Sequence, residues 1–217
     1  MPRGGRSRYD VGRRMLQLLR EGDLYIWVLM ATSVVSLAMM IDRGLALRWP
    51  KIIPPPLLEA LDRFTQGGDG LALEKASLQY DSSLGRLLRL GLDNATRPRE
   101  ETRDAIETRA RREVSRLERG LVVLEICVGI APLLGLVGTI HGLITLFGDL
   151  GKMGLGESSV FARGIAIALN ATLLGLLVAI PSLVAWSYFS RKVETLAIEM
   201  ESACSELVEH LYPRGGK

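Results

Sequence analysis

Two apolar stretches decide the fold of this chain: LVVLEICVGIAPLLGLVGTIHGLITLF at residues 121–147 and IAIALNATLLGLLVAIPSLVAWSYF at residues 165–189. Each is longer than the roughly 20 apolar residues that a helix needs to cross a bilayer. A third stretch, residues 24–41, contains no charged side chain. We therefore predict an all-α membrane protein with three transmembrane helices.

Each long stretch carries a threonine at mirrored depth: Thr139 lies about eight residues before the first stretch ends, and Thr172 about seven residues after the second begins. At about 1.5 Å rise per residue, both hydroxyls are roughly 10–12 Å below the same membrane surface. A lone membrane threonine is a weak signal, because its hydroxyl can bond to the carbonyl one turn earlier. The matched depth favours a bundle interior or a wet path.

Composition and turn signals predict the organisation of the rest of the chain. Prolines follow the first span and precede short helical patterns at 57–66, 71–80 and 83–95, which indicate a small helical domain. The predicted segments are an N-terminal amphipathic segment at 1–23, a first span at 24–41, a cytoplasmic helical loop domain at 42–98, a long cytoplasmic helix at 99–148 that continues into the second span, a short periplasmic hairpin at 149–163, a third span at 164–189, and a cytoplasmic C-terminal helix and tail at 190–217.

Basic residues set the predicted orientation. With the N-terminus outside, 19 Lys and Arg lie inside and 8 outside. Cytoplasmic loops carry an excess of such residues, so we expect a periplasmic N-terminus and a cytoplasmic C-terminus. The six arginines among the first 20 residues oppose this arrangement.

The motif content gives no support to enzymatic chemistry, to a cofactor or to a metal site. The glycine-rich run at 67–70 is not followed by Lys-Ser or Lys-Thr, so it indicates a turn rather than a phosphate-binding loop. The net charge is +3, and no aromatic residues interleave with the basic ones, so we expect no nucleic-acid binding.

Small residues and prolines recur in the second and third spans. Small residues at fourth positions let helix backbones approach closely. Prolines free backbone carbonyls, which predicts either kinks or a wetted path. The residues expected to serve helix packing and kinks are Pro132, Gly135, Gly138, Gly142, Gly175 and Pro181.

Two long helices are predicted to project beyond the membrane. The first is densely charged, and both Glu107/Arg111 and Arg109/Glu113 are four residues apart, where opposite charges can meet. We interpret this as a solvated charged face. Each helix also carries an apolar stripe, which predicts side-by-side packing and oligomerisation.

Glu125 is the acidic residue inside the second stretch. Positions 125, 132 and 139 are seven apart, so Glu125 and Thr139 share nearly one helix face and are roughly 21 Å apart. In an oligomer, Glu125 would ring the cytoplasmic exit of a pore. The alternative is a headgroup-level acid paired with Arg119 or Lys192.

Several motifs make the chain resemble a known family over roughly residues 12–210. They are LERGL at 117–121, APLLGLVGTIHG at 131–142, GIA at 164–166 and TLLGLLVAIP at 172–181. With these motifs the sequence resembles the ExbB/TolQ/MotA family of ion-driven motor subunits, most closely ExbB and TolQ.

The resemblance implies a proton-conducting complex of the bacterial inner membrane that converts proton-motive force into work. It implies a homopentamer around single-span partners of the ExbD/TolR type, whose membrane aspartate carries the proton, and a TonB/TolA-like protein that reaches across the periplasm. Thr139 and Thr172 match the family's pore threonines. Their implied role is to hydrate the partner carboxylate and to hydrogen-bond to it.

Two positions depart from the family pattern. Ile167 stands where ExbB-like proteins commonly carry glutamate, and Asn170 lies one turn further on. Asn170 either supplies polarity or makes an inter-helix hydrogen bond. His141 stands where the family often has tryptophan, about 200° from Thr139 on an ideal helix. We expect it to face a neighbouring helix rather than the pore; a proton relay is the alternative.

Two rival functions remain open at the level of sequence. A non-conducting oligomeric membrane scaffold would need no membrane acid, and the missing glutamate favours it. A sodium-driven stator relative would use threonine rings for another ion, but stators have four spans and this chain has three predicted ones.

Overall fold

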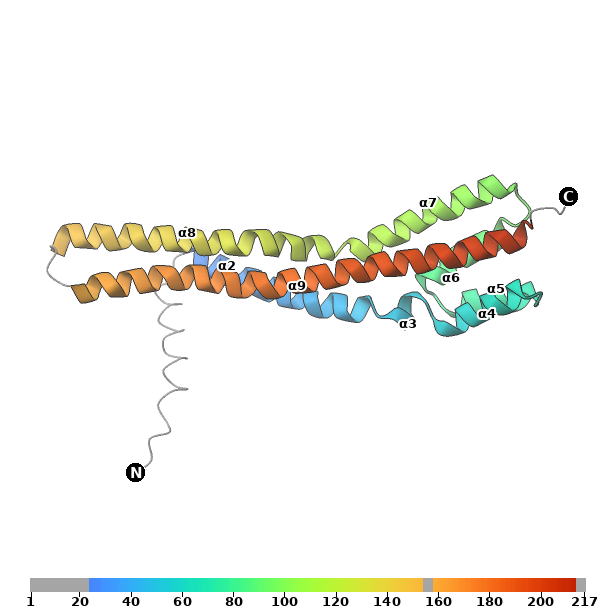
Figure 1. Ribbon diagram of the computed structural model, residues 1–217, viewed down its shortest axis with the longest axis horizontal. Coiled ribbons are helices and arrows are strands. Elements are labelled where there is room, and N and C mark those ends of the chain that lie inside the picture. Colours follow the sequence, from blue (N-terminus) through green and yellow to red (C-terminus); the bar gives the residue numbers. More distant parts are fainter. Residues whose placement is uncertain (1–23, 154–157, 214–217) are drawn as a thin grey trace, which may run out of the picture. The chain divides into compact units, whose positions relative to one another are not determined.

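The computed structural model describes residues 24–153 and 158–213. All its regular elements are α-helices, with no strand among the described residues, so the predicted all-α class is confirmed. The amphipathic segment predicted at 1–23 lies outside the described residues. The helices are α2 (Leu24–Ala46), α3 (Trp49–Ile52), α4 (Pro55–Thr65), α5 (Gly70–Gln79), α6 (Ser83–Asp93), α7 (Arg99–Glu118), α8 (Leu121–Met153) and α9 (Ser158–Leu211) (Figure 1).

Three helices are long and apolar enough to cross a membrane, by length and composition: Tyr25–Ala46, Leu121–Gly148 and Gly164–Leu211. This confirms the three predicted spans. The helices run further than predicted at the 149–163 hairpin, because α8 continues to Met153 and α9 begins at Ser158. The third span and the C-terminal helix form one continuous helix, α9.

The single helix predicted over 99–148 is wrong, because α7 ends at Glu118 and α8 begins at Leu121. Gly120, in the break, is buried against Arg43: a Cβ there would lie 2.5 Å from the Arg43 Nε. The Arg43 guanidinium donates to the Leu117 carbonyl oxygen at 3.4 Å. The Arg43 side chain therefore fills the space that a side chain at position 120 would need, and glycine at this position favours the interruption.

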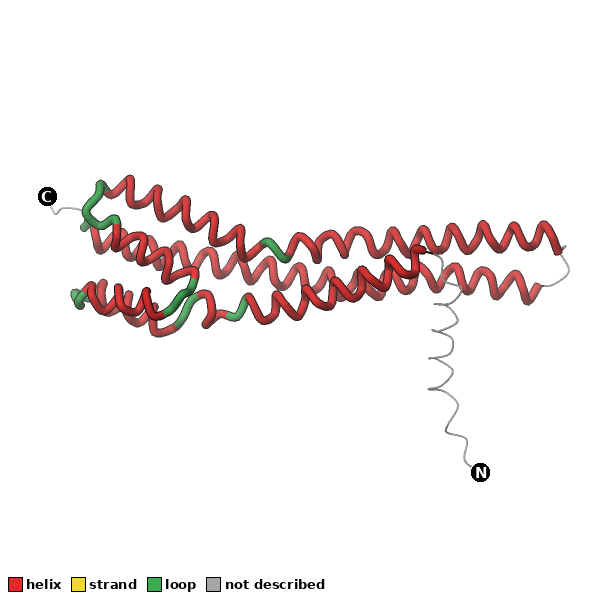
Figure 2. The backbone as a smooth tube through the Cα atoms, turned by 180° about the vertical axis from the view of Figure 1, so that it is seen from behind, coloured by secondary structure: helices red, strands yellow, loops and turns green. Residues whose placement is uncertain are grey.

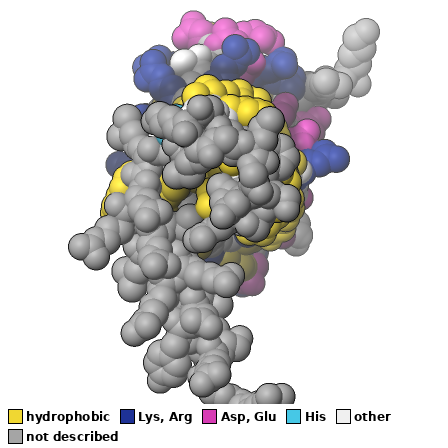
Figure 3. Space-filling view, turned by 90° about the vertical axis from the view of Figure 1, so that its left-hand side faces the viewer, with side chains coloured by type: hydrophobic (Ala, Val, Ile, Leu, Met, Phe, Trp, Pro, Cys, Tyr) yellow, Lys and Arg dark blue, Asp and Glu magenta, His cyan; other side chains and the backbone are white. Residues whose placement is uncertain are grey.

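The chain divides into two compact units. The first, the membrane unit, contains residues up to Met40 and Val123–Ala185; the second, the helical-domain unit, contains Ile41–Val122 and Trp186–Lys217. In the membrane unit, large apolar side chains such as Val34, Leu133 and Ile144 are exposed. Figure 3, which looks at the molecule from the left-hand side of Figure 1, shows apolar side chains (yellow) at the surface. Such a surface needs lipid or another protein to cover it.

Local sequence explains the short helices of the helical-domain unit. Prolines occupy the first positions of α4, where a missing N–H costs nothing. The Asp69 carboxylate accepts from the Leu71 N–H at the start of α5, and the Ser82 hydroxyl accepts from the Gly85 N–H at the start of α6. Gly67 has φ +93° in the turn between α4 and α5, a conformation that favours glycine.

Helix α6 packs on α7 and α9, and Phe64 of α4 lies against His210 of α9; Figure 2 shows the short helices beside the long ones. The core of this unit consists of buried apolar side chains from the short helices and from α9. They are Leu57, Leu61, Leu73, Leu84, Leu87 and Leu88 of the short helices, and Leu196, Met200 and Leu207 of α9. In α6, Gly91 lies between Leu207 of α9 and Ile106 of α7. At the end of α9, the Tyr212 hydroxyl lies 2.8 Å from the Arg97 carbonyl oxygen and 2.9 Å from the Thr102 hydroxyl. The core therefore ties α6, α7 and α9 together.

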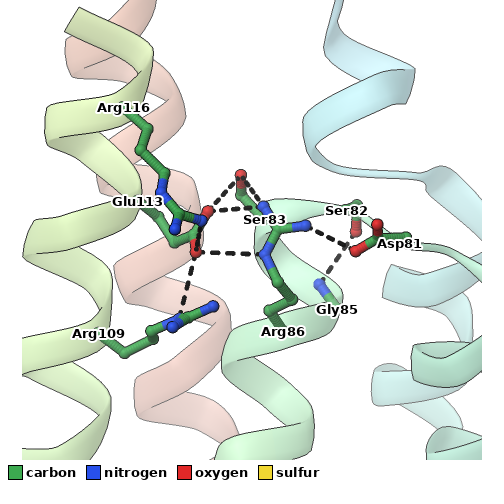
Figure 4. A network of polar contacts seen from close by, with 8 residues as sticks. All are labelled: Asp81, Ser82, Ser83, Gly85, Arg86, Arg109, Glu113 and Arg116. Carbon is green, nitrogen blue, oxygen red and sulfur yellow. Dashed lines mark hydrogen bonds and ion pairs between the residues drawn. The ribbon is translucent and has the colours of Figure 1, made fainter. Parts of the chain in front are cut away.

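A buried carboxylate joins α6 to α7 (Figure 4). The Glu113 side chain is 1% exposed and lies 2.6 Å from Arg86, 3.2 Å from Arg109 and 3.3 Å from Arg116. The Ser83 hydroxyl donates to it at 3.2 Å. The predicted pairs Arg109/Glu113 and Glu107/Arg111 are both present. The interpretation as a solvated face is wrong at Glu113, because α6 covers it.

The partners of Glu113 control its ionisation. Burial by itself raises the pKa of the carboxyl, but the hydrogen bond and charge of Arg86, together with Ser83 and Arg109, outweigh burial and hold the pKa below its ordinary value. A carboxyl whose pKa is lower in the folded state stabilises the fold above its unfolded pKa, and that contribution is lost as pH falls through the folded pKa.

We predict that Glu113→Gln destabilises the helical-domain unit by about 3 kcal/mol at neutral pH, because it breaks a buried ion-pair network. The wild-type protein should lose this advantage below about pH 4.5, the ordinary value of the glutamate pKa. Thermal unfolding of the full chain in detergent across pH 3–8 measures both effects. Glu107→Gln removes the exposed pair with Arg111 and is the matched control; an equal loss in both variants would contradict the assignment.

Candidate functional site

The close contact between α8 and α9 positions the predicted site. A Cβ on Gly175 would lie 2.6 Å from the Ala131 carbonyl oxygen, and one on Gly135 would lie 2.9 Å from the Ala171 carbonyl oxygen. Real Cβ atoms essentially never approach backbone so closely, so the two backbones touch only because both positions are glycine. A Cβ on Gly142 would lie 3.0 Å from the Ala168 Cβ and 3.2 Å from its Cα, a tight but less severe contact. This contact brings hydroxyls on the two helices within reach of each other.

The structure brings Thr139 and Thr172 together at this contact. Their hydroxyls hydrogen-bond to each other. The Thr139 hydroxyl also lies 3.0 Å from the Ala168 carbonyl oxygen and 3.2 Å from that of Gly135, and the Thr172 hydroxyl lies 3.4 Å from the Gly135 carbonyl oxygen. Both residues are half-buried. A bond to the carbonyl one turn earlier on the same helix therefore accounts for only one of these contacts, and the others join α8 to α9.

The hydroxyl pair can change its hydrogen-bond direction. Each hydroxyl has one proton to donate and two lone pairs to accept with. If Thr139 donates to Thr172, Thr172 can donate to the Gly135 carbonyl; if Thr172 donates to Thr139, Thr139 can donate to the Ala168 carbonyl. In both arrangements lone pairs remain free to accept from a further donor. The pair can therefore serve either a protonated acid or a hydrated proton without repacking.

Helix α2 packs on one side of the α8–α9 pair. The Tyr25 ring lies against Gly138, where a Cβ would be 2.6 Å from the Tyr25 Cε2. The Cys127 thiol donates to the Thr32 carbonyl at 4.0 Å. Since Thr139 follows Gly138, its side chain is rotated by about 100° from the α2 contact. The threonine pair therefore lies toward the side of the α8–α9 pair that α2 leaves uncovered.

A second hydroxyl pair joins α2 to α9, and the sequence reasoning missed it. Ser36 and Ser182 are buried with their hydroxyl oxygens 2.6 Å apart, and Ser182 also donates to the Val178 carbonyl at 2.6 Å. Two small polar residues within the first and third apolar stretches were the available signal, as with the threonines. This pair fixes α2 against α9.

The other predicted polar residues do not join the threonine pair. The His141 ring lies 5.8 Å from the Tyr25 ring of α2, between centroids, so it faces α2. Asn170 is exposed and precedes Thr172 by two residues, which places it on nearly the opposite face of α9. Glu125 and Ile167 are exposed.

Both prolines lie inside helices, Pro132 half-buried in α8 and Pro181 exposed in α9. Each removes a backbone donor from its helix. The Ser182 hydroxyl, beside Pro181, bonds within the same helix. The prediction of a kink or a wetted path at these residues stays a prediction.

A sequence model of the MotA/TolQ/ExbB proton channel family matches residues 79–202. The chain belongs to this family. The matched residues include all of α7 and α8 and both threonines, and the match confirms the resemblance drawn from the motifs. Together with the three apolar helices, it identifies the chain as a membrane protein.

Individual relatives agree with this family. The chain is 31% identical over 192 residues to the Tol-Pal system protein TolQ of Pseudomonas aeruginosa, with 80% of each chain covered. It is 38% identical over 81 residues to the biopolymer transport protein ExbB of Helicobacter pylori, which covers 37% of this chain and 56% of that one. An ExbB homologue of Methanothermobacter thermautotrophicus is 28% identical over 181 residues. That match covers 83% of this chain and 64% of the relative's length.

We predict that Gly175→Ala destabilises the α8–α9 contact by about 1–3 kcal/mol, because its Cβ would collide with the Ala131 carbonyl oxygen and force the helices apart. Gly129→Ala, at a position with nothing within 4 Å of a Cβ, is the matched control and should be neutral or stabilising. Thermal unfolding in detergent compares the two. Equal stability of both variants would contradict the proposed close approach.

Proposed function

We propose that this protein is an ExbB/TolQ-like subunit of a proton-channel motor in the bacterial inner membrane. With a single-span ExbD/TolR-like partner it uses proton-motive force to energise transport or another envelope process. The membership in the proton channel family supports the class of function. The names of the relatives, biopolymer transport protein and Tol-Pal system protein, support the kind of process.

The observation that carries the proposal is the half-buried threonine pair. Polar groups inside a membrane are costly, and they usually face a bundle interior or a water-filled path. Thr139 and Thr172 lie toward the side of the α8–α9 pair that α2 leaves uncovered, with lone pairs available to a further donor. In an oligomer with this side turned inward, one such pair per copy would ring a central pore.

The pair needs an acid from another chain. The spans described hold no carboxylate near the two threonines: Glu125 is 14 residues from Thr139, roughly 21 Å along α8. A partner helix with a membrane aspartate, threaded through the ring, would supply the proton carrier. Thr139 and Thr172 would then accept from the protonated carboxyl and hold water beside the ionised one. A TonB/TolA-like protein would carry the work across the periplasm.

A pentamer with the N-terminus periplasmic and the C-terminus cytoplasmic completes the proposal. The excess of Lys and Arg on the proposed inner side supports the orientation. The second candidate is a non-conducting scaffold. Ile167, at the position of the family's glutamate, favours it, because it leaves this face of α9 without a titratable group. Proton flux separates the two candidates.

We predict that Thr139→Val and Thr172→Val each lower proton flux at least tenfold when the chain is co-expressed with an ExbD/TolR-like single-span partner. Valine keeps the shape but removes the hydroxyl, so the partner acid loses its hydrogen bonds. Thr139→Ser restores the hydroxyl and should recover most of the flux. Flux is measured in proteoliposomes with a pH-sensitive dye.

Thr145→Val is the matched control for these variants. The Thr145 hydroxyl lies 3.0 Å from the carbonyl of His141, one turn earlier on the same helix, and pairs with no α9 hydroxyl among the described residues. It should leave flux unchanged. Wild-type flux in both Thr139→Val and Thr172→Val would overturn the pore assignment and leave the scaffold as the better reading.

We predict that Glu125→Gln lowers flux several-fold with a smaller effect at high salt, because an acidic ring at a pore exit concentrates cations. Glu125 is exposed on the membrane unit, within the apolar helix α8. Glu101→Gln, on the exposed face of α7, is the control. Unchanged flux and unchanged energised transport in Glu125→Gln would leave this residue as a headgroup-level acid.

A further inference from the structure

The helical-domain unit contains a groove that the proposed function does not use. It lies between α7 and the C-terminal part of α9 and has a volume of ≈ 610 Å³. Its floor consists of small or apolar side chains, among them Ile106, Ala110 and Val114 of α7 and Cys204 and Val208 of α9. Because Gly91 of α6 lies between Leu207 and Ile106, α6 covers one side of the α7–α9 pair, and the groove opens elsewhere.

The two walls of the groove carry opposite charge. In the α7 wall three arginines, Arg99, Arg103 and Arg111, outnumber the two glutamates, Glu107 and Glu118, and Arg111 is paired with Glu107. Glu201 and Glu209 make the α9 wall negative. Among the described residues no ion pair joins the α7 wall to the α9 wall. An occupant that suits this groove has an apolar ridge with an acid along one edge and a base along the other.

Helix α5 of the same chain has this pattern on its outer face. Leu71 and Leu78 are 58% and 52% exposed and lie two turns apart, about 10 Å, on one face. Glu74 lies about 60° to one side of Leu71 and Lys75 about 40° to the other. Both charged side chains are exposed, and neither forms an ion pair among the described residues. Two exposed leucines in register on a short helix are typical of a contact surface.

The groove and the α5 face cannot meet within one copy. Helix α5 packs on α4 and α6, and Figures 1 and 2 show α5 and α7 on opposite sides of α9 in this unit. The contact therefore requires a second copy. Two different surfaces of one chain that fit each other make a head-to-tail contact, and such contacts close into rings when the rotation permits.

We propose that the outer face of α5 in one copy docks in the α7–α9 groove of the next copy. Leu71 and Leu78 enter the floor between α7 and α9, a helix-in-groove arrangement. Glu74 faces the arginine wall near Arg103, and Lys75 faces Glu201. This contact lies outside the membrane unit, so it does not depend on proton conduction.

Cross-linking between differently tagged copies tests the docking directly. One copy carries Gln79→Cys, which lies on the Lys75 edge of α5, and the other carries Ser205→Cys, in the α9 wall. Cys127 and Cys204 are replaced by alanine in both. With a short bismaleimide, we expect a cross-link only in the mixture of the two. Glu199→Cys replaces Ser205→Cys in the control, because position 199 is about 200° around α9 from Ala197 of the groove.

Charge reversal tests the complementarity. Glu74→Lys with Lys75→Glu keeps the net charge and should lower the cross-link yield about three- to tenfold, since it opposes both walls. Arg103→Glu with Glu201→Arg in the other copy should restore the yield. The matched control reverses an exposed pair on α4, Glu59→Arg with Arg63→Glu, and should change nothing.

Two outcomes would overturn the docking. One is a cross-link as strong with position 199 as with position 205, and the other is no cross-link between copies that co-purify. Flux through the same assembly is measured separately. Normal flux without the cross-link would reject the docking and retain the proposed channel. The cross-link without flux would support the docking and reject the proposed channel.

Discussion

The contact of α8 with α9 at Gly135 and Gly175 is the constraint on which the membrane unit depends. Lipid offers no hydrophobic drive for helices to associate, so close backbone contact and hydrogen bonds must hold them. Gly175 places its backbone against the Ala131 carbonyl oxygen, and Gly135 does the same with Ala171. At this separation the hydroxyls of Thr139 and Thr172 meet. A methyl group at either glycine would separate the helices and the hydroxyls with them.

Polar groups in this unit are arranged in two pairs with different surroundings. Ser36 and Ser182 are buried between α2 and α9 and satisfy each other, which is the arrangement of a structural hydrogen bond. Thr139 and Thr172 are half-buried on the side that α2 leaves uncovered, and three backbone carbonyl contacts surround them. The first pair has no access to a further ligand, whereas the second does. This difference in burial supports a role in conduction for the threonines alone.

Buried charge holds α6 against α7 in the helical-domain unit, whereas small residues allow the close helix contact in the membrane unit. Glu113 would be costly to bury without partners, and Arg86, Arg109, Arg116 and Ser83 compensate for its burial. The network fixes α6 against α7, and Gly91 of α6 holds both against α9. The groove between α7 and α9 is then a consequence of this packing. No ion pair joins its two walls among the described residues of one copy, and this is the basis of the proposed docking.

The sequence by itself determined the all-α class, the three spans, the short helices of the loop domain and the family. These follow from apolar length, period and local motifs, which need no knowledge of neighbours. The matched membrane depth of Thr139 and Thr172 also followed from the sequence, because the rise per residue of a helix fixes how far each residue lies from the end of its span. Only the tertiary structure decided that α7 ends before Gly120, where Arg43 of a distant segment packs against the glycine and donates to the Leu117 carbonyl. It alone revealed that Glu113 is buried and that Ser36 meets Ser182, because burial and pairing depend on which helix covers which face.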